Sequence, residues 1–171
     1  MTKEFSQLLI NSKGCISFTG SVASILPVPW NAIYGASKAA LKHYCEILSL
    51  EMRPFNVKVL NFITGGVDTE IFELFKPIPE SSRYYSEATE KSLHSLNDLH
   101  KMDSKTYAKK VVNDILHTNR SREVPRGAGA TLGYLLSLLP ISIVSFLFIK
   151  VFKLDGVFEA IRQKAKARFV E

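Results

Sequence analysis

Apolar residues recur along the chain with two spacings, and these predict alternating helices and strands. Residues 5–9 have helical spacing, and Gly14 predicts the stop of that helix. The run 15–19 (CISFT) predicts a buried strand, and residues 32–53 predict a long helix that ends before Pro54. The run 57–63 (VKVLNFI) predicts a second buried strand. Strand, helix and strand in this order predict a βαβ unit with parallel strands and a right-handed crossover.

The middle of the chain is polar and carries one clear helix signal. Residues 67–105 are polar and loosely helical, with prolines that break any long element. Residues 104–117 (SKTYAKKVVNDILH) predict an amphipathic helix, with Ser104 as its N-cap. Its apolar side consists of Tyr107, Ala108, Val111, Val112 and Ile115. Residues 122–126 (REVPR) are too polar to predict a buried strand.

A long stretch without charge follows. Residues 127–149 form an uncharged run of 23, and a membrane span needs about 20 apolar residues. Pro140 lies near the middle, which fits a kinked span or a helical hairpin inserted from one side; a buried core helix is the alternative. We therefore expect a partial α/β domain over 1–126, a hydrophobic membrane-associated segment over 127–152, and a basic amphipathic tail over 153–171 that lies on a surface.

Composition and charge limit the classes of binding partner that we expect. The 171 residues carry a formal net charge of +6, and residues 150–171 hold six Lys/Arg against three acids. Aromatic residues are not interleaved with these cations and no nucleic-acid motif is present, so we expect a membrane surface as partner and no nucleic acid. Cys15 and Cys45 lie in apolar segments, which predicts reduced, buried thiols. His43 and Cys45 have no second ligand pair at zinc spacing, so we expect no metal.

Ser21, Tyr34 and Lys38 carry the candidate chemistry. Tyr34 and Lys38 are four residues apart on the predicted helix, so they share a face, and Ser21 follows the carboxyl end of a predicted strand. Carbonyl reduction needs a phenol that exchanges its proton near neutral pH, and a neighbouring ammonium favours the phenolate. Tyr34 is then the general acid, Lys38 its electrostatic partner and Ser21 a donor to the substrate carbonyl. The Tyr-Lys pair alone is weak evidence for this chemistry, because many solvated helices carry two such residues at this spacing.

The context of these residues resembles the short-chain dehydrogenase/reductase family. The string GSVASILPVPWNAIYGASKAALKHYCEILSLEM, with Ser21 thirteen residues before Tyr34, is similar to the Ser and Tyr-x-x-x-Lys pattern of that family. The string VLNFITGGVDTEIF looks like the loop after the next strand of the family. The resemblance implies a Rossmann-type doubly wound parallel sheet, NADPH as hydride donor, and a cofactor site formed by Tyr34, Lys38, Gly65, Gly66, Val67 and Thr69.

Within the family, PWNAIYGASKAAL and ITGGV are similar to a fungal group that reduces 1-acyldihydroxyacetone phosphate to lysophosphatidic acid with NADPH. That resemblance implies a lipid-linked ketone as substrate and the cytosolic face of the endoplasmic reticulum membrane or lipid droplets as location; a homo-oligomer is possible. Lys76, Arg83 and Lys91 are then candidates for the phosphate headgroup.

Two features depart from the family pattern. Its Gly-rich pyrophosphate loop precedes the Ser segment, whereas only twenty residues precede Ser21 here. We therefore expect the C-terminal half of the Rossmann-type sheet, and the alternative to an active reductase is a catalytically inactive, membrane-associated fragment. The string GAGATLG at 127–133 imitates a phosphate loop, but without a preceding strand we expect only a flexible lead-in to the apolar segment.

Overall fold

The computed structural model describes residues 2–71, 77–97 and 99–167. They form two compact units. The first unit comprises residues 1–68 and 101–138, and the second comprises residues 69–100 and 139–171.

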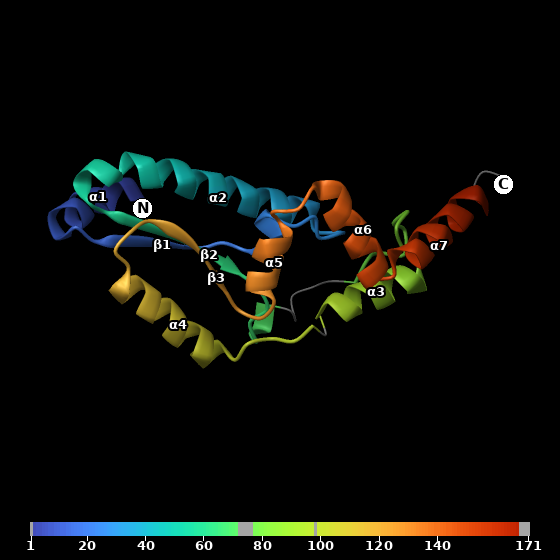
Figure 1. The fold of residues 1–171 in the computed structure, drawn as a ribbon. Helices are drawn as coiled ribbons and strands as arrows, with labels where there is room; N and C mark the ends of the chain where they lie inside the picture. Colours follow the sequence, from blue (N-terminus) through green and yellow to red (C-terminus); the bar gives the residue numbers. More distant parts are fainter. Residues whose placement is uncertain (1, 72–76, 98, 168–171) are drawn as a thin grey trace. The chain divides into compact units, whose positions relative to one another are not determined.

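A three-stranded parallel sheet is the centre of the first unit (Figure 1). Its strands are β1 (Cys15–Thr19), β2 (Lys58–Thr64) and β3 (Arg122–Arg126), in the order β1-β2-β3. The register places Thr19 beside Phe62 and Phe62 beside Val124. The two predicted strands and their parallel pairing are therefore confirmed, but the prediction of a buried strand was wrong for β1, which has no fully buried residue because it lies at the end of the sheet order. The strand β3 is a third strand that the sequence pattern did not predict.

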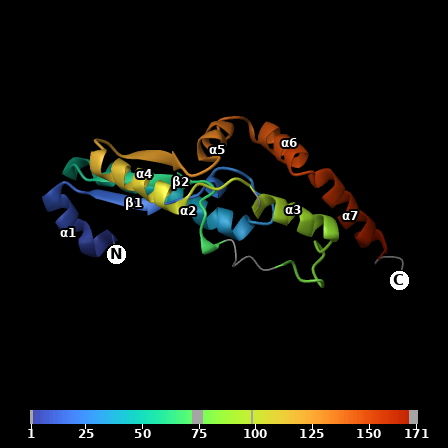
Figure 2. The same cartoon turned by 90° about the horizontal axis from the view of Figure 1, so that it is seen from below.

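Helices cover both faces of this sheet, as the two views in Figures 1 and 2 show. The helix α2 (Ala32–Glu51) covers one face and α4 (Ser104–His117) the other, while α1 (Thr2–Ser12) precedes β1. Short turns η1 (Val22–Ser24) and η2 (Arg53–Phe55) follow β1 and α2, and α5 (Ala130–Leu136) follows β3. This layering confirms the predicted α/β class.

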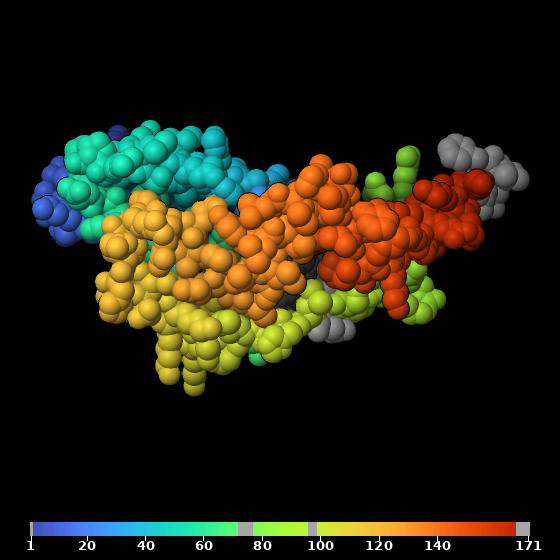
Figure 3. Space-filling view, viewed as in Figure 1, coloured from blue at the N-terminus to red at the C-terminus, as the bar shows by residue number. Residues whose placement is uncertain are grey.

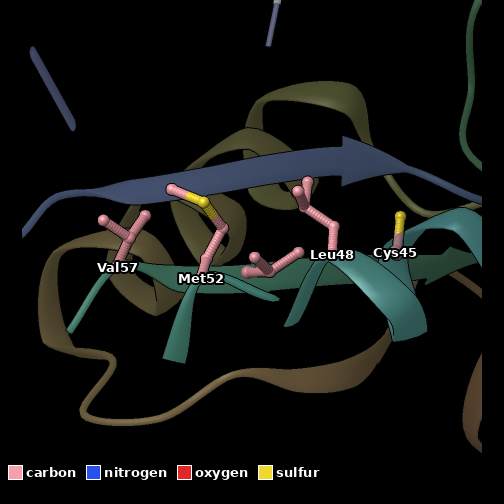
Figure 4. Close-up of a cluster of buried hydrophobic side chains, with 5 residues drawn as sticks. Cys45, Leu48, Met52 and Val57 are labelled. Carbon is pink, nitrogen blue, oxygen red and sulfur yellow. The ribbon is translucent and has the colours of Figure 1, made fainter. Parts of the chain in front are cut away.

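Two apolar clusters hold the layers together. Between α2 and the sheet, Figure 4 shows Cys45, Leu48 and Met52 facing the strands, where they pack with Val57 and Val59. On the opposite face, Leu60, Phe62 and Val124 pack against α4 through Val111 and Ile115. Successive residues of β2 thus point to opposite faces and both faces are apolar, as expected of a strand buried between helices.

An ion pair fastens α4 to β3. The buried carboxylate of Asp114 accepts from Arg126 Nε at 2.7 Å and from Arg126 Nη2 at 2.8 Å. At the start of α4, the Asp103 side chain accepts from the Thr106 amide at 2.8 Å, so Asp103 is the N-cap. The prediction of Ser104 was wrong by one residue, since a carboxylate can reach the same orphan amides and is also favoured by the helix dipole.

The second unit is helical. It contains α3 (Glu87–Asn97), α6 (Ile141–Val151) and α7 (Leu154–Ala167). The helix α7 packs against both α3 and α6, and the space-filling view shows the side chains of α6 and α7 in contact (Figure 3). Its buried side chains include Val144 of α6 and Leu154 and Val157 of α7.

The uncharged stretch 127–149 is not one helix. It contains the seven residues of α5, a turn, and the first nine residues of α6, which ends at Val151. Pro140 cannot donate a backbone hydrogen bond, and its carbonyl accepts from the amides of Ile143 and Val144, so it begins α6 and cannot continue α5. Across the described ranges, no helix combines the length and the apolar character needed to cross a membrane. The expectation of a spanning helix therefore has to be corrected.

Candidate active site

Ser21 lies just beyond the carboxyl end of β1. It is buried and caps η1, and its Oγ accepts a hydrogen bond from the Ala23 amide at 3.1 Å. A hydroxyl that accepts in this way still has its own proton to donate. The backbone turn thus fixes the position of the Ser21 hydroxyl and leaves it able to donate to a carbonyl oxygen.

Tyr34 and Lys38 lie in the first turns of α2, on one side of the helix. The Lys38 Nζ is 5.8 Å from the centre of the Tyr34 ring and donates to the Thr19 carbonyl at 2.9 Å. Thr19 is the last residue of β1, so this bond ties α2 to the carboxyl end of the strand. The ammonium is therefore held beside the phenol by a fixed backbone acceptor.

A close approach of two turns brings these three residues together. A Cβ added at Gly35, the residue after Tyr34, would lie 3.1 Å from the carbonyl oxygen of Ala23, which belongs to the Ser21 turn. The first turn of α2 therefore packs directly on η1. Ser21, Tyr34 and Lys38 therefore lie at the carboxyl edge of the sheet, where open α/β sheets bind ligands, and their role as one catalytic site stays a prediction.

The loop of Gly65, Gly66 and Val67 follows β2 at this same edge. The Gly65 amide donates to the Arg126 carbonyl at 2.9 Å. Gly66 and Ala128 exchange two backbone hydrogen bonds, of 2.9 and 2.8 Å. Because neighbouring parallel strands end at one edge, the carboxyl end of β1 and this loop lie side by side.

Comparison with known proteins identifies the family. Residues 1–77 match the family model described as short chain dehydrogenase. The chain is 40% identical over 171 residues to NADPH-dependent 1-acyldihydroxyacetone phosphate reductase of Saccharomyces cerevisiae. The aligned region covers 97% of this chain and 57% of that protein. The chain belongs to the short-chain dehydrogenase/reductase family.

Other members of this family also match most of this chain. Short-chain dehydrogenase ptmH of Penicillium ochrochloron is 39% identical over 145 residues, covering 82% of this chain and 52% of that protein. The crystal structure of a short-chain dehydrogenase from Streptomyces avermitilis superposes with a TM-score of 0.62 at 19% identity, over 93% of this chain and 57% of that one. This likeness shows a Rossmann-like fold. The chain spans about half the length of the curated relatives it matches.

Some predicted site residues belong to the second unit or lie outside the described residues. Thr69 is exposed and belongs to the second unit, as do the exposed Arg83 and Lys91. The Lys91 ammonium is paired with Glu87 at 2.6 Å on the surface of α3. Lys76 lies outside the described residues. The first unit therefore brings together Ser21, Tyr34, Lys38 and the Gly65–Val67 loop, and no more of the predicted set.

The prediction for the Gly-rich string at 127–133 has to be corrected. Residues 122–126 form β3, and α5 begins at Ala130, so the strand-turn-helix arrangement expected to be missing is present. Gly127 and Gly129 have φ values of 93° and 70°, which favour glycine. The Ala128 amide, however, donates to Gly66 rather than pointing toward a ligand. This turn of the short-chain dehydrogenase fold thus closes the loop after β2 and is no flexible lead-in.

Sequence reasoning missed a polar network between α2 and the sheet. Lys42 pairs with Glu46 and with Glu123 of β3, the latter at 3.0 Å. Burial alone would lower the pKa of Lys42, but hydrogen bonds to both glutamates outweigh burial and raise that pKa. Asn61 Nδ2 donates to Glu123 at 3.5 Å, and an added Cβ at Gly20 would lie 2.5 Å from Asn61 Oδ1. An asparagine inside the apolar run of β2 was the one signal that could have revealed it.

The two cysteines do not take part in the site. Both are free thiols, and Cys45 is buried between α2 and the sheet. Burial, with a further contribution from Glu123 and Glu46, raises the pKa of the Cys45 thiol to about 11. Burial also raises the pKa of Cys15. These environments suit structural thiols and not nucleophiles.

Proposed function

We propose that this chain carries the substrate-activating groups of an NADPH-dependent carbonyl reductase. The observation that carries the proposal is the position of the Lys38 ammonium, 5.8 Å from the centre of the Tyr34 ring and bonded to the Thr19 carbonyl at 2.9 Å. A cation fixed beside a phenol stabilises the phenolate that remains after the phenol has given up its proton. The buried Ser21 hydroxyl beside it provides a second donor for the same carbonyl oxygen.

The residues at the sheet edge fit the reacting end of a nicotinamide cofactor. Tyr34 and Lys38 offer a hydroxyl and an ammonium there, and the Gly65–Val67 loop, whose Gly65 packs against the backbone of Ala128 and Ala130, borders the same edge with backbone atoms. The Gly66 amide is bonded to Ala128, so the loop would approach a cofactor by its shape rather than by that donor. The cofactor, when bound, supplies a hydride.

In the proposed reduction, Ser21 and Tyr34 act on the ketone oxygen, and Lys38 acts on Tyr34. Ser21 Oγ donates a hydrogen bond to that oxygen and orients the carbonyl. As the carbonyl carbon receives the hydride, the Tyr34 hydroxyl transfers its proton to the oxygen, so a ketone becomes a secondary alcohol. Lys38 stabilises the resulting Tyr34 phenolate until a proton from solvent restores it.

For the substrate we propose 1-acyldihydroxyacetone phosphate, which would be reduced to lysophosphatidic acid. The name of the yeast relative at 40% identity supports this choice. A substrate with an acyl chain is met at a lipid surface, which is consistent with a proposed location on the cytosolic face of the endoplasmic reticulum or on lipid droplets.

The test compares two tyrosines of the same helix. Tyr34 and Tyr44 are exposed to similar extents, 42% and 45%, but only Tyr34 lies beside Lys38. NADPH oxidation with 1-acyldihydroxyacetone phosphate is measured for the chain, Tyr34→Phe and Tyr44→Phe. We expect Tyr34→Phe to lower kcat by about 10²-fold or more, as for loss of a general acid, and Tyr44→Phe to leave it unchanged. Failure of the parent chain to bind NADPH and to turn over would instead support the catalytically inactive alternative.

A further inference from the structure

The helix α6 has more apolar surface than the second unit covers. Val144 is 2% exposed, whereas Ile143 and Phe146 are 46% and 58% exposed. A helix that is apolar on all sides is normally buried on all sides. Ile143 and Phe146 are three residues apart and therefore lie together on the side that the unit leaves open.

The basic helix α7 is already partnered. Its apolar residues Leu154 and Val157 are 2% and 3% exposed, and α7 packs against α3 and α6. Most of its exposed side chains are polar, Arg162 and Lys166 among them. The apolar residues Leu154 and Val157 are therefore covered within the chain, and the prediction that the basic amphipathic tail lies on a surface stays a prediction.

A cation lies at the end of the exposed stripe of α6. Lys150 is four residues beyond Phe146, and its Nζ lies 5.7 Å from the centre of the Phe146 ring. The same Nζ pairs with Asp155 at 2.6 Å, and both side chains are more than half exposed, so this ion pair is weak. Residues 127–149 contain no charge, whereas residues 150–171 hold six Lys/Arg against three acids. An apolar stripe with a cationic border is complementary to an anionic lipid surface.

The length of α6 decides how it can meet such a surface. Eleven residues at about 1.5 Å each give a helix of roughly 16 Å, about half of the hydrocarbon thickness of a bilayer. We propose that α6 lies in the plane of an anionic phospholipid surface, with Ile143 and Phe146 inserted among the acyl chains and Lys150 at the level of the phosphates. This binding surface is separate from the proposed reductase site.

Another exposed apolar surface fits a lipid less well. The helix α2 exposes Ile33 and Leu50, but its Glu46 and Glu51 balance Lys38 and Lys42, so it has no net positive charge. Carboxylates are repelled by anionic headgroups, so charge favours α6 over α2. A second copy of the chain could also cover α6, and the experiment below separates that case.

The test measures partition of the chain onto vesicles by flotation. Vesicles of phosphatidylcholine alone are compared with vesicles that contain phosphatidylserine. We expect the double variant Ile143→Ser/Phe146→Ser to lower partition onto both by about tenfold or more, because each side chain loses most of the apolar area it would bury. Lys150→Glu should lower partition by about tenfold on the phosphatidylserine vesicles only.

A matched double variant controls for general loss of apolar surface. Val112 and Leu116 of α4 are 53% and 72% exposed and lie on a helix that also carries lysines. Val112→Ser/Leu116→Ser should leave partition unchanged, and circular dichroism should show all variants folded. The proposal is overturned if the two double variants bind equally, if the parent chain binds neither vesicle, or if the α6 variant abolishes a lipid-free dimer instead. None of these readouts involves NADPH or a ketone, so they are independent of the proposed reaction.

Discussion

Replacing Gly65 by alanine should disturb the loop after β2. An added Cβ would lie 2.2 Å from the Ala128 carbonyl oxygen and 2.9 Å from the Ala130 amide nitrogen. Ordinary contacts between such atoms are about 3.5 Å, so the turn that contains Ala128 must move by about 1 Å. Both neighbours are backbone atoms, which cannot rotate away as a flexible side chain could.

The cost follows from the bonds that this movement breaks. Gly66 and Ala128 exchange two backbone hydrogen bonds, each contributing about 0.5–1.5 kcal/mol. Overpacking adds about 1–3 kcal/mol, whereas the stiffer unfolded chain of the alanine variant returns about 0.4–1 kcal/mol. We therefore expect Gly65→Ala to lower the free energy of unfolding of the first unit by about 1–5 kcal/mol.

Trp30 makes this change measurable. It is the single tryptophan of the chain and lies in the first unit, so its fluorescence during urea unfolding reports on that unit. Gly156→Ala in α7 is the control, because an added Cβ there meets no heavy atom within 4 Å. By circular dichroism this control should be equally stable or more stable by up to about 1 kcal/mol. A loss below about 0.5 kcal/mol for Gly65→Ala would refute the close packing of the two turns.

Three further outcomes are expected. Asp114→Asn should lower the free energy of unfolding by about 2–3 kcal/mol in urea, because the Arg126 charge loses its buried partner; combining it with Arg126→Met should cost less than the two changes added together. Since burial raises the pKa of the Cys45 thiol to about 11, iodoacetamide at pH 8 should alkylate it slowly in the folded chain and rapidly in urea, as mass spectrometry would show. Hydrogen bonding from Lys42 lowers the pKa of Glu46 below its ordinary 4.5, so the stability that ionised Glu46 contributes is present above 4.5 and lost as the pH falls through the lower folded value. The urea midpoint of Glu46→Gln should consequently depend less on pH in the acid range than that of the parent; an identical dependence would exclude the interaction.

Strong local signals explain which elements could be predicted. The limits of β1 and α4 follow from a compact apolar run and from an amphipathic repeat, and both are confirmed. In β3, only Val124 is a fully buried apolar residue, and Pro125 lacks an amide to donate. Such a sequence is tolerated because β3 pairs with β2 alone, and an edge strand can expose charge and accept a proline. Its strand character comes from pairing with a partner distant in sequence, which no local pattern records.

The candidate site also has contacts that the sequence could predict and contacts that it could not. Helical spacing was sufficient to predict that Tyr34 and Lys38 share a face, and their separation of 5.8 Å agrees. The Thr19 carbonyl that holds Lys38 lies nineteen residues earlier in the chain. The pairing of Gly66 with Ala128 joins segments still farther apart, so it follows from the sheet order and not from a motif.

These long-range contacts form one connected support for the sheet edge. The helix α4 holds β3 through Asp114 and Arg126, and the Arg126 carbonyl accepts from the Gly65 amide. The same helix reaches the end of β2 directly, where the hydroxyls of Tyr107 and Thr64 lie 2.8 Å apart. The loop proposed to face the cofactor is thus fixed from the side of the sheet opposite α2, which carries Tyr34 and Lys38. Loosening α4 should therefore move the Gly65–Val67 loop while the Lys38 bond to Thr19 is retained, so cofactor positioning and proton transfer have structurally separate supports.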